Sequence, residues 1–219
     1  MIKHVFFDFN GTIIDDLDLC LELLNDILRK HKRPLVDIEK YRDLFTFPIR
    51  DYYIAAGVDF AQDTYEDLAI DFINKYQPRS LECNLFKGLE ETFKELNEIG
   101  VNCYILSASQ RSNLYEQCES FGIVKYFKDI LGIDNIHAAS KVHIGINYIK
   151  ESNINLEEAI FIGDTTHDYE VAQAMGIRCY LVRCGHQSVR KLSTVEAPII
   201  DSACDILEVI KKENKINIL

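Results

Sequence analysis

Six short apolar segments without polar alternation recur along the chain, and they constrain its fold more than any other feature. Such segments are typical of strands buried on both faces, as in a parallel sheet. Between them, apolar residues recur at three- and four-residue spacing, which is typical of amphipathic helices. This alternation predicts an α/β fold with an open, Rossmann-like parallel sheet and crossover helices. The expected strands cover residues 2–7, 103–106, 129–131, 159–162, 179–182 and 198–200, and the clearest expected helices cover 89–99, 144–149, 171–175 and 206–210.

Residues 16–84 interrupt this alternation, because they contain successive helical patterns and no buried strand. The last pattern covers residues 68–76, and we expect its helix to end at Pro78 because proline disfavours helix continuation. A helical insert after the first strand fits this region better than a continued alternation. We therefore expect an α/β core formed by residues 1–15 and 85–219, with a helical cap formed by residues 16–84.

The charge balance and the cysteines argue against several classes of protein. The 219 residues include 24 Lys+Arg and 35 Asp+Glu, a formal net charge of −11, whereas nucleic-acid binders carry basic surfaces. The chain contains no run of Lys and Arg that would indicate binding to an anionic membrane surface. No apolar run approaches the roughly 18 residues that a membrane span requires. The seven cysteines are scattered without a C-x-x-C pair. We therefore expect reduced thiols in a cytoplasmic protein that binds neither nucleic acid nor membrane.

The first expected strand ends in Asp8-Phe9-Asn10-Gly11-Thr12. In an open parallel sheet, ligands bind beyond the carboxyl ends of the strands. An aspartate at that place, followed by a flexible glycine, can direct its carboxylate into the crevice. A plain Asn-Gly turn explains the same residues without any chemistry.

A second acidic group, Asp164 and Asp168, follows the strand expected at 159–162. The four-residue spacing places both carboxylates near one face of a helical turn. Together with Asp8 they would form an oxygen-rich pocket of the kind that Mg²⁺ prefers. Helix N-capping is the alternative explanation, and two acidic strand ends together make it less attractive.

Ser107 and Lys141 are weaker signals of the same kind. Ser107 follows the strand expected at 103–106, where a hydroxyl and backbone N–H groups at a helix start can hold a phosphate oxygen. Lys141 stands at an expected helix N-terminus, which is electrostatically unfavourable for a cation and suggests a role beside the carboxylates. Capping and an ordinary solvated lysine are the alternatives.

Taken in order, these four segments resemble the four motifs of the haloacid dehalogenase superfamily of hydrolases. Asp8–Thr12 resembles the first motif (Asp-x-Asp-Gly-Thr), Ser107 the second, Lys141 the third and Gly163–Asp168 the fourth. The likeness extends from residue 2 to about residue 206 and includes the helical insert after the first motif. Within the superfamily, the chain is most similar to the phosphoglycolate phosphatase and β-phosphoglucomutase-like members.

The resemblance implies an Mg²⁺-dependent phosphatase that hydrolyses a small phosphorylated metabolite through an aspartyl-phosphate. Asp8 would be the nucleophile, and Ser107 and Lys141 would bind the transferring phosphoryl oxygens. The implied metal site consists of Asp8, the Asn10 main-chain carbonyl, Asp164 and Asp168, the last of these orienting a metal-bound water or Lys141. The implied catalytic residues are Asp8, Asn10, Ser107 and Lys141, and the implied substrate-binding residues are Gly11, Thr12, Ser107, Ala108 and Lys141.

Asn10 departs from the family pattern, in which the second aspartate protonates the leaving oxygen and then activates water. A carboxamide cannot exchange a proton at neutral pH, so the loss of hydrolysis rate should be largest for esters with poor leaving groups. Three explanations stay open. The substrate has a good leaving group, another group such as Asp15, Asp16 or His167 replaces the acid, or the protein is a vestigial enzyme that binds a phosphorylated ligand.

Substrate choice is expected to lie in the cap, where residues 45–50 read as a loop that faces the core. Arg50 is the cap residue that we assign to substrate binding, with Arg42 and Lys40 as further basic candidates; ordinary surface charge is the alternative for each. His143 and His186 are expected to be surface or supporting residues rather than metal ligands. We expect a monomer or a weak homodimer. A phosphate-binding regulatory protein, a phosphomutase and a dehalogenase are the rival functions.

Overall fold

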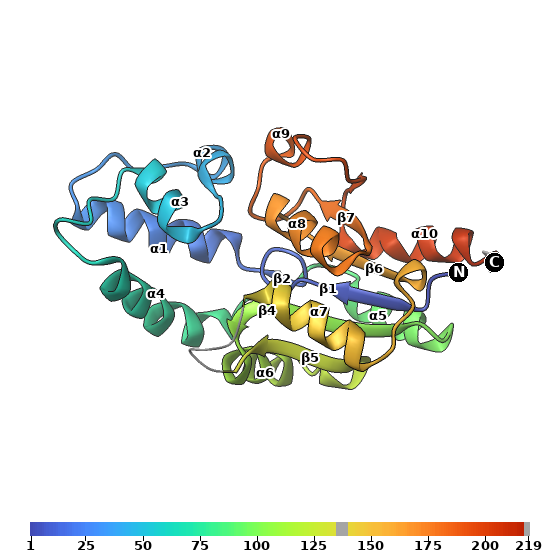
Figure 1. Ribbon diagram of the computed structural model, residues 1–219. Coiled ribbons are helices and arrows are strands. Elements are labelled where there is room, and N and C mark those ends of the chain that lie inside the picture. Colours follow the sequence, from blue (N-terminus) through green and yellow to red (C-terminus); the bar gives the residue numbers. More distant parts are fainter. Residues whose placement is uncertain (135–139, 217–219) are drawn as a thin grey trace.

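The computed structural model describes residues 1–134 and 140–216 of the chain. A six-stranded sheet with the order β5-β4-β1-β6-β7-β8 forms its centre, and all of its paired strands are parallel. The predicted open parallel sheet is confirmed. Its strands are β1 (His4–Phe7), β4 (Asn102–Gln110), β5 (Phe127–Ile133), β6 (Ala159–Gly163), β7 (Arg178–Val182) and β8 (Ile199–Ile200) (Figure 1).

Both faces of the sheet are covered by helices, which explains why its strands lack polar alternation. Val5 and Phe7 on β1 belong to one apolar core, and Phe6 between them belongs to the other. Helices α5 (Leu89–Glu98), α6 (Arg111–Ser120) and α10 (Ile206–Glu213) pack on the first face, and α7 (Lys141–Glu151), α8 (Thr166–Met175) and the short α9 (Val189–Leu192) pack on the second.

The cap contains four helices and lies beyond one end of the sheet (Figure 1). Its own apolar core includes Leu24, Leu28 and Leu68, separate from the two cores of the sheet. The cap helices are α1 (Leu17–Lys30), α2 (Ile38–Leu44), α3 (Ile49–Ala56) and α4 (Tyr65–Ser80).

The expectation that the last cap helix ends at Pro78 is wrong, because α4 continues to Ser80. The Ser80 hydroxyl donates to the carbonyl of Gln77 over 2.8 Å and accepts from the Gln117 amide over 2.7 Å. These bonds hold the last turn in place although Pro78 cannot donate a backbone hydrogen bond.

Two very short strands join the cap to the sheet. β2 (Ile14–Asp15) and β3 (Asn84–Leu85) form an antiparallel pair in which Ile14 faces Leu85 and Asp15 faces Asn84. The expected domain boundaries fall at this pair, while the division into two domains stays a prediction. Strands of two residues carry no periodic pattern, so the sequence did not indicate them.

Two further observations concern the class of protein. Among the described residues, the structure contains no helix with the length and apolar character needed to cross a bilayer. All seven cysteines lie in the described part of the chain, and all are free thiols.

Candidate active site

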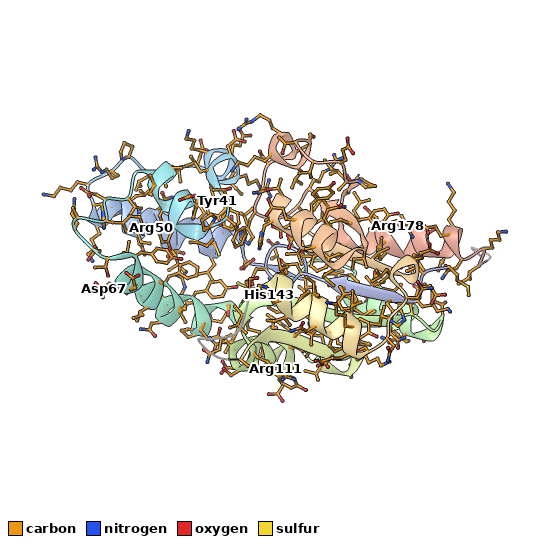
Figure 2. The ribbon with its side chains drawn as sticks, viewed as in Figure 1. Tyr41, Arg50, Asp67, Arg111, His143 and Arg178 are labelled. Atoms are coloured by element: carbon orange, nitrogen blue, oxygen red, sulfur yellow. The ribbon has the colours of Figure 1, made fainter. Side chains whose placement is uncertain are left out.

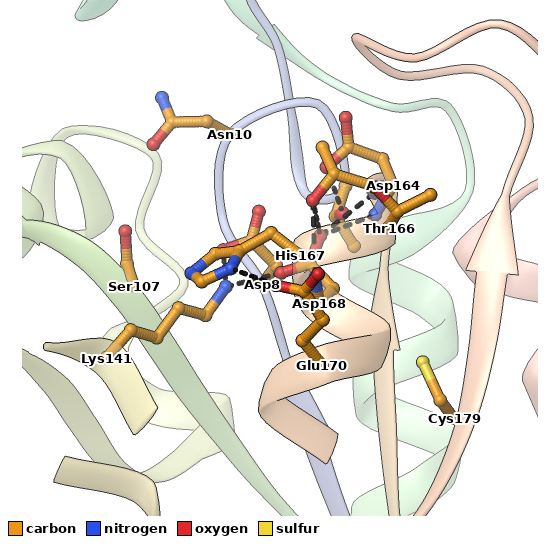
Figure 3. A network of polar contacts seen from close by, with 12 residues as sticks. Asp8, Asn10, Ser107, Lys141, Asp164, Thr166, His167, Asp168, Glu170 and Cys179 are labelled. Atoms are coloured by element: carbon orange, nitrogen blue, oxygen red, sulfur yellow. Dashed lines mark hydrogen bonds and ion pairs between the residues drawn. The ribbon is translucent and has the colours of Figure 1, made fainter. Parts of the chain in front are cut away.

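Three neighbouring strands bring the predicted site residues together at one edge of the sheet. β1 lies between β4 and β6, and Asp8 and Asp164 directly follow β1 and β6. Ser107 lies within β4, because this strand continues to Gln110 instead of ending at residue 106 as expected, and its pairing with β5 is irregular after Leu106. The Asp8 backbone N–H donates to the carbonyl of Ile162 over 2.8 Å and extends the pairing of β1 with β6 to the site itself. The carboxylates and Lys141 therefore meet above the strand ends (Figure 3).

Lys141 forms the centre of a buried ion network. Its Nζ donates to Asp8 Oδ1 over 2.5 Å and to Asp168 Oδ1 over 2.6 Å, and its side chain is 4% exposed. Burial alone would lower the pKa of Lys141, but the two carboxylates raise it above its ordinary value. Lys141 is the first residue of α7, so these carboxylates explain a cation at an otherwise unfavourable helix position.

Asp168 serves both as a helix cap and as a partner of Lys141. Its Oδ2 accepts hydrogen bonds from the backbone N–H groups of Asp164 and Thr165 and from the Thr165 hydroxyl, which completes a capping box at the start of α8. Burial would raise the pKa of Asp168, but Lys141 and Thr165 hold it below its usual range. The capping and functional explanations of this residue are therefore both satisfied.

The pKa values of Asp8 and Asp164 are shifted in the opposite direction, upward. Burial raises the pKa of Asp8 to about 6 although Lys141 opposes the shift. Burial also raises the pKa of Asp164 to about 8, with the charges of Asp168 and Asp8 adding to it and His186 opposing it. These buried carboxylates repel one another and have too little positive charge beside them.

The carboxylate oxygens of Asp8, Asp164 and Asp168 lie within 4.8 Å of one another, which suits a divalent cation. An all-oxygen donor set favours Mg²⁺, and a cation would relieve the repulsion that raises the two pKa values. Both oxygens of Asp168 already accept hydrogen bonds. Both oxygens of Asp164 accept as well, from the Thr12 hydroxyl and the His186 backbone N–H, so the hydrogen bonds alone do not rank these two carboxylates as ligands.

Asn10 is held in place by neighbouring polar groups. Its Nδ2 donates to Asp16 Oδ2 over 2.9 Å and to the Tyr76 hydroxyl over 2.5 Å, and its Oδ1 accepts from the Ser109 hydroxyl over 3.3 Å. In Figure 3 its amide lies apart from the contact between Lys141 and Asp8. The hydrogen bonds fix a side chain that has no acidic proton to give.

Asp16, His186 and Tyr41 form a buried chain of contacts behind Asn10. His186 Nε2 lies 3.1 Å from Asp16 Oδ1, and its Nδ1 lies 2.9 Å from the Tyr41 hydroxyl. Burial would lower the pKa of His186, but Asp16 raises it to about 9. The pKa of Asp16 is held below its usual range, since His186, Tyr76 and Asn10 outweigh the effect of burial. His186 and Asp16 are thus a charged pair at neutral pH.

The sequence placed Asp16 among the candidate replacements for the acid and His186 among the supporting residues. The structure shows that His186 follows β7, the neighbour of β6, and that its backbone N–H donates to Asp164 Oδ2 over 2.6 Å. His143 is exposed, and His167 pairs with Glu170 at 3.0 Å. The position of His186 after a sheet strand was the available signal for its role.

Gly11 is required by its backbone conformation and by close packing. Its φ is +70°, and an added Cβ would collide with the side chains of Asp164 and His186. Its N–H donates to Asp16 Oδ1 over 3.0 Å. Thr12 is also buried, and its hydroxyl donates to Asp164 Oδ1 over 3.3 Å. These two residues support the acidic group, rather than lining the cavity above it.

A cavity of about 410 Å³ lies above the strand ends and reaches into the cap. Asp8, Asn10, Ser107, Ala108 and Lys141 line its lower part, so the structure brings these predicted site residues together.

The cap cation assigned to substrate binding does not lie with this group. Arg50 is exposed and is not among the lining residues, and its guanidinium lies 5.3 Å from the centre of the Phe60 ring (Figure 2). Arg42 donates instead to the carbonyls of Gly185 and Cys184. The substrate-binding role of Arg50 therefore stays a prediction that this arrangement does not favour.

Comparison with known proteins identifies the family. A sequence profile of the haloacid dehalogenase-like hydrolases matches residues 5–182. Phosphoglycolate phosphatase 1 of Pseudomonas aeruginosa is 25% identical over 215 residues, which cover 94% of this chain and 78% of that protein. The phosphoglycolate phosphatase of Vibrio parahaemolyticus is 23% identical over 228 residues, with coverage of 95% and 96%.

Solved structures share the fold along nearly the whole chain. A haloacid dehalogenase-like hydrolase from Streptococcus pneumoniae superposes with a TM-score of 0.80 at 20% identity, covering 95% of this chain and 98% of that one. A protein described as a predicted phosphatase, from Clostridium acetobutylicum, gives a TM-score of 0.78 at 21% identity, with coverage of 97% and 99%. The chain is therefore an enzyme of the haloacid dehalogenase-like hydrolase family, as its four motifs predict, and its curated relatives are phosphatases.

Proposed function

We propose that this enzyme is an Mg²⁺-dependent phosphatase that acts on a small phosphorylated metabolite. The observation that carries the proposal is the buried contact of Lys141 with both Asp8 and Asp168, beside Asp164. A carboxylate can approach a phosphate dianion only where positive charge is held between them. The names of the curated relatives support the same class of reaction.

In the proposed reaction, an Asp8 carboxylate oxygen attacks phosphorus and the bond to the leaving oxygen breaks. The Ser107 hydroxyl and Lys141 Nζ bind the phosphoryl oxygens, which keeps phosphorus in line with Asp8. Water then attacks the aspartyl-phosphate, releasing inorganic phosphate and restoring Asp8. Mg²⁺, held by Asp8, Asp164 and the Asn10 main-chain carbonyl, would supply charge neutralisation for the phosphoryl group.

The cap, residues 16–84, would cover the substrate and exclude water during the reaction. Its helices supply one side of the cavity, whereas the strand ends supply the reacting groups. The paired linker strands β2 and β3 would be the hinge. A monomer or weak homodimer in the cytoplasm completes the proposal, in keeping with the seven free thiols.

The absence of a proton donor at Asn10 favours substrates with good leaving groups. Asn10 cannot protonate a leaving oxygen, and its neighbour Asp16 is ionised because its pKa is lowered. The carboxylate that contacts Asn10 is therefore not a proton donor. Activated esters and acyl phosphates need no such acid, so we propose that they are hydrolysed faster than alkyl esters.

The test is phosphate release with and without Mg²⁺, comparing acetyl phosphate and p-nitrophenyl phosphate with ethyl phosphate. We expect Mg²⁺-dependent turnover of the first two compounds and little turnover of ethyl phosphate. The double variant Asn10→Asp/Asp16→Asn keeps the charge of the pair constant and should raise ethyl phosphate turnover by roughly 10²-fold or more. The single variant Asn10→Asp would place two carboxylates about as close as the present 2.9 Å contact, so it is the less informative partner.

Absence of turnover with every compound would contradict the phosphatase proposal and favour a vestigial enzyme that binds a phosphorylated ligand. Equal turnover of activated and alkyl esters would instead contradict the leaving-group part alone. That result would require another proton donor near Asn10.

A further inference from the structure

The cavity extends from the reacting groups into the cap, and its cap side is aromatic. It spans from Asp8 and Lys141 to residues on the cap helices, and its volume of about 410 Å³ is in the range of small-molecule sites. Eight aromatic cap residues line it, and we call six of them the aromatic wall: Tyr41, Phe45, Tyr52, Tyr53, Phe72 and Tyr76.

Polar groups of the aromatic wall are partly engaged by the protein itself. The Tyr41 hydroxyl lies 2.9 Å from His186 Nδ1, and the Tyr76 hydroxyl donates to Asp16 over 2.6 Å. Phe72 stacks on Tyr76 with 11° between the ring planes. The aromatic wall therefore presents ring surface to a ligand, and these two hydroxyls are already bonded elsewhere.

Each lysine or histidine side chain that lines the cavity within the described residues faces a carboxylate. Lys141 contacts Asp8 and Asp168 at the floor, where the phosphoryl group binds. His186 faces Asp16 at 3.1 Å. The third, His167, faces Glu170 at 3.0 Å and stacks on Phe47. Within residues 1–134 and 140–216, the cap side of the cavity thus offers no free cation to a second anionic group of a ligand.

We propose that the substrate is a phosphate monoester whose leaving group is uncharged and carries a ring that packs against the aromatic wall. This inference rests on the phosphatase function proposed above and names its substrate class. Phosphoglycolate, the compound in the names of the curated relatives, carries a carboxylate in place of the ring. Burial of that carboxylate beside aromatic rings without a cation is unfavourable.

An aryl ester fits a second observation at the same site. A phenoxide leaves more readily than an alkoxide, so it depends less on a proton donor at the position of Asn10. The aromatic wall and the missing acid therefore point to the same chemistry, although they are located on different elements of the fold. Tyr76 links them, because its hydroxyl accepts from Asn10.

Binding is tested with two phosphonates that cannot be hydrolysed, benzylphosphonate and phosphonoacetate. The first carries a phenyl ring where the second carries a carboxylate. Neither has a leaving group, so leaving-group chemistry does not enter the comparison. In the presence of Mg²⁺, we expect benzylphosphonate to inhibit p-nitrophenyl phosphate hydrolysis at a concentration roughly tenfold or more below that of phosphonoacetate. Equal inhibition, or stronger inhibition by phosphonoacetate, would overturn the inference.

A matched pair of variants locates the effect in the cavity. Ile73 and Ile70 are both on α4 and are 50% and 60% exposed, but only Ile73 lines the cavity. Ile73→Arg should weaken the inhibition by benzylphosphonate about tenfold and strengthen the inhibition by phosphonoacetate, because it adds a cation and removes apolar surface. Ile70→Arg makes the same change of net charge and should leave the inhibition constants of both phosphonates as in the wild type. Identical behaviour of the two variants would contradict a ring site at this wall.

Isothermal titration with each phosphonate separates this inference from the proposed function. If no ester is hydrolysed but benzylphosphonate still binds more tightly than phosphonoacetate, the phosphatase proposal fails and the ring site stands. If p-nitrophenyl phosphate is hydrolysed but the carboxylate binds as well as the ring, the phosphatase proposal stands and the ring site fails.

Discussion

The two sides of the cavity are built on opposite principles. The floor, formed by Asp8, Lys141, Asp164 and Asp168, is buried and densely charged, whereas the opposite side is the aromatic wall of the cap. Charges at the floor are fixed by strand ends and helix starts, which hold reacting groups within narrow limits. Under the proposed function, this difference assigns the chemistry to the α/β core and the choice of ligand to the cap helices.

The two sides belong to different packing units, which are joined through the Tyr41 and Tyr76 hydroxyls at His186 and Asp16. The floor is continuous with the two cores of the sheet, while the cap has a core of its own around Leu24, Leu28 and Leu68. Substitutions of the other four members of the aromatic wall should therefore change ligand preference without moving the carboxylates. Substitutions in the floor should instead alter the carboxylates without changing ligand preference.

The largest expected effect comes from removal of the nucleophile on the floor. Asp8→Asn should lower p-nitrophenyl phosphate turnover by about 10⁴-fold or more, because it removes the proposed nucleophile. Circular dichroism should show a folded protein, since the strand pairing of β1 does not use this side chain. Substantial turnover in this variant would show that the floor does not carry the chemistry.

A second test removes the cation that holds the floor together. Lys141→Met leaves Asp8 and Asp168 buried without their shared partner, so the free energy of unfolding should fall by about 3–5 kcal/mol. Urea denaturation at neutral pH measures it. The control is Lys150→Met at the exposed end of the same helix, which should change stability by less than about 0.5 kcal/mol. Similar losses in both variants would mean that the ion network is not a stabilising unit.

A third test concerns the pH dependence of stability, which Mg²⁺ should reverse. Asp8 and Asp164 have pKa values raised to about 6 and about 8. They therefore keep protons in the folded chain that they release when it unfolds. Without Mg²⁺, the free energy of unfolding should accordingly fall as pH rises from 3.8 toward 8. His186 acts in the same direction: its contribution is complete below pH 6.5 and is lost as pH rises through about 9.

Mg²⁺ binds the deprotonated carboxylates, so its stabilising effect should grow between pH 6 and pH 8. At a free concentration about 100-fold above its dissociation constant, the gain is roughly 2.7 kcal/mol. Thermal unfolding with Mg²⁺ or with a chelator, across this range, measures both effects. Asp164→Asn should remove the Mg²⁺ response. A response that is independent of pH, or that persists in this variant, would place the ion elsewhere.

Much of the sheet could be predicted from the sequence, because strands buried on both faces leave continuous apolar runs such as Val5-Phe6-Phe7. Helix α6 has no comparable signal. Among its ten residues only Leu114, Gln117 and Cys118 are buried, so it lacks the apolar stripe that marks other helices. The two-residue strands β2 and β3 were missed for a similar reason.

The floor of the site was predictable because its residues follow strands within short, dense motifs. The supporting contacts were not, since His186 meets Tyr41 across 145 residues and Asp16 across 170 residues of sequence. No local pattern records such distant pairs. The aromatic wall was hidden in the same way, because its members come from three different cap helices and an adjoining loop.

The strand pair β2–β3 makes the cap a removable piece of the topology. The chain departs at Asp15 and returns at Asn84, which face each other as antiparallel partners. A tight turn of two to five residues is the usual way to join two such strands. A β-hairpin could therefore replace the four helices without altering the strand order of the six-stranded sheet. In evolutionary terms, this junction allows one catalytic scaffold to exchange one helical insert for another.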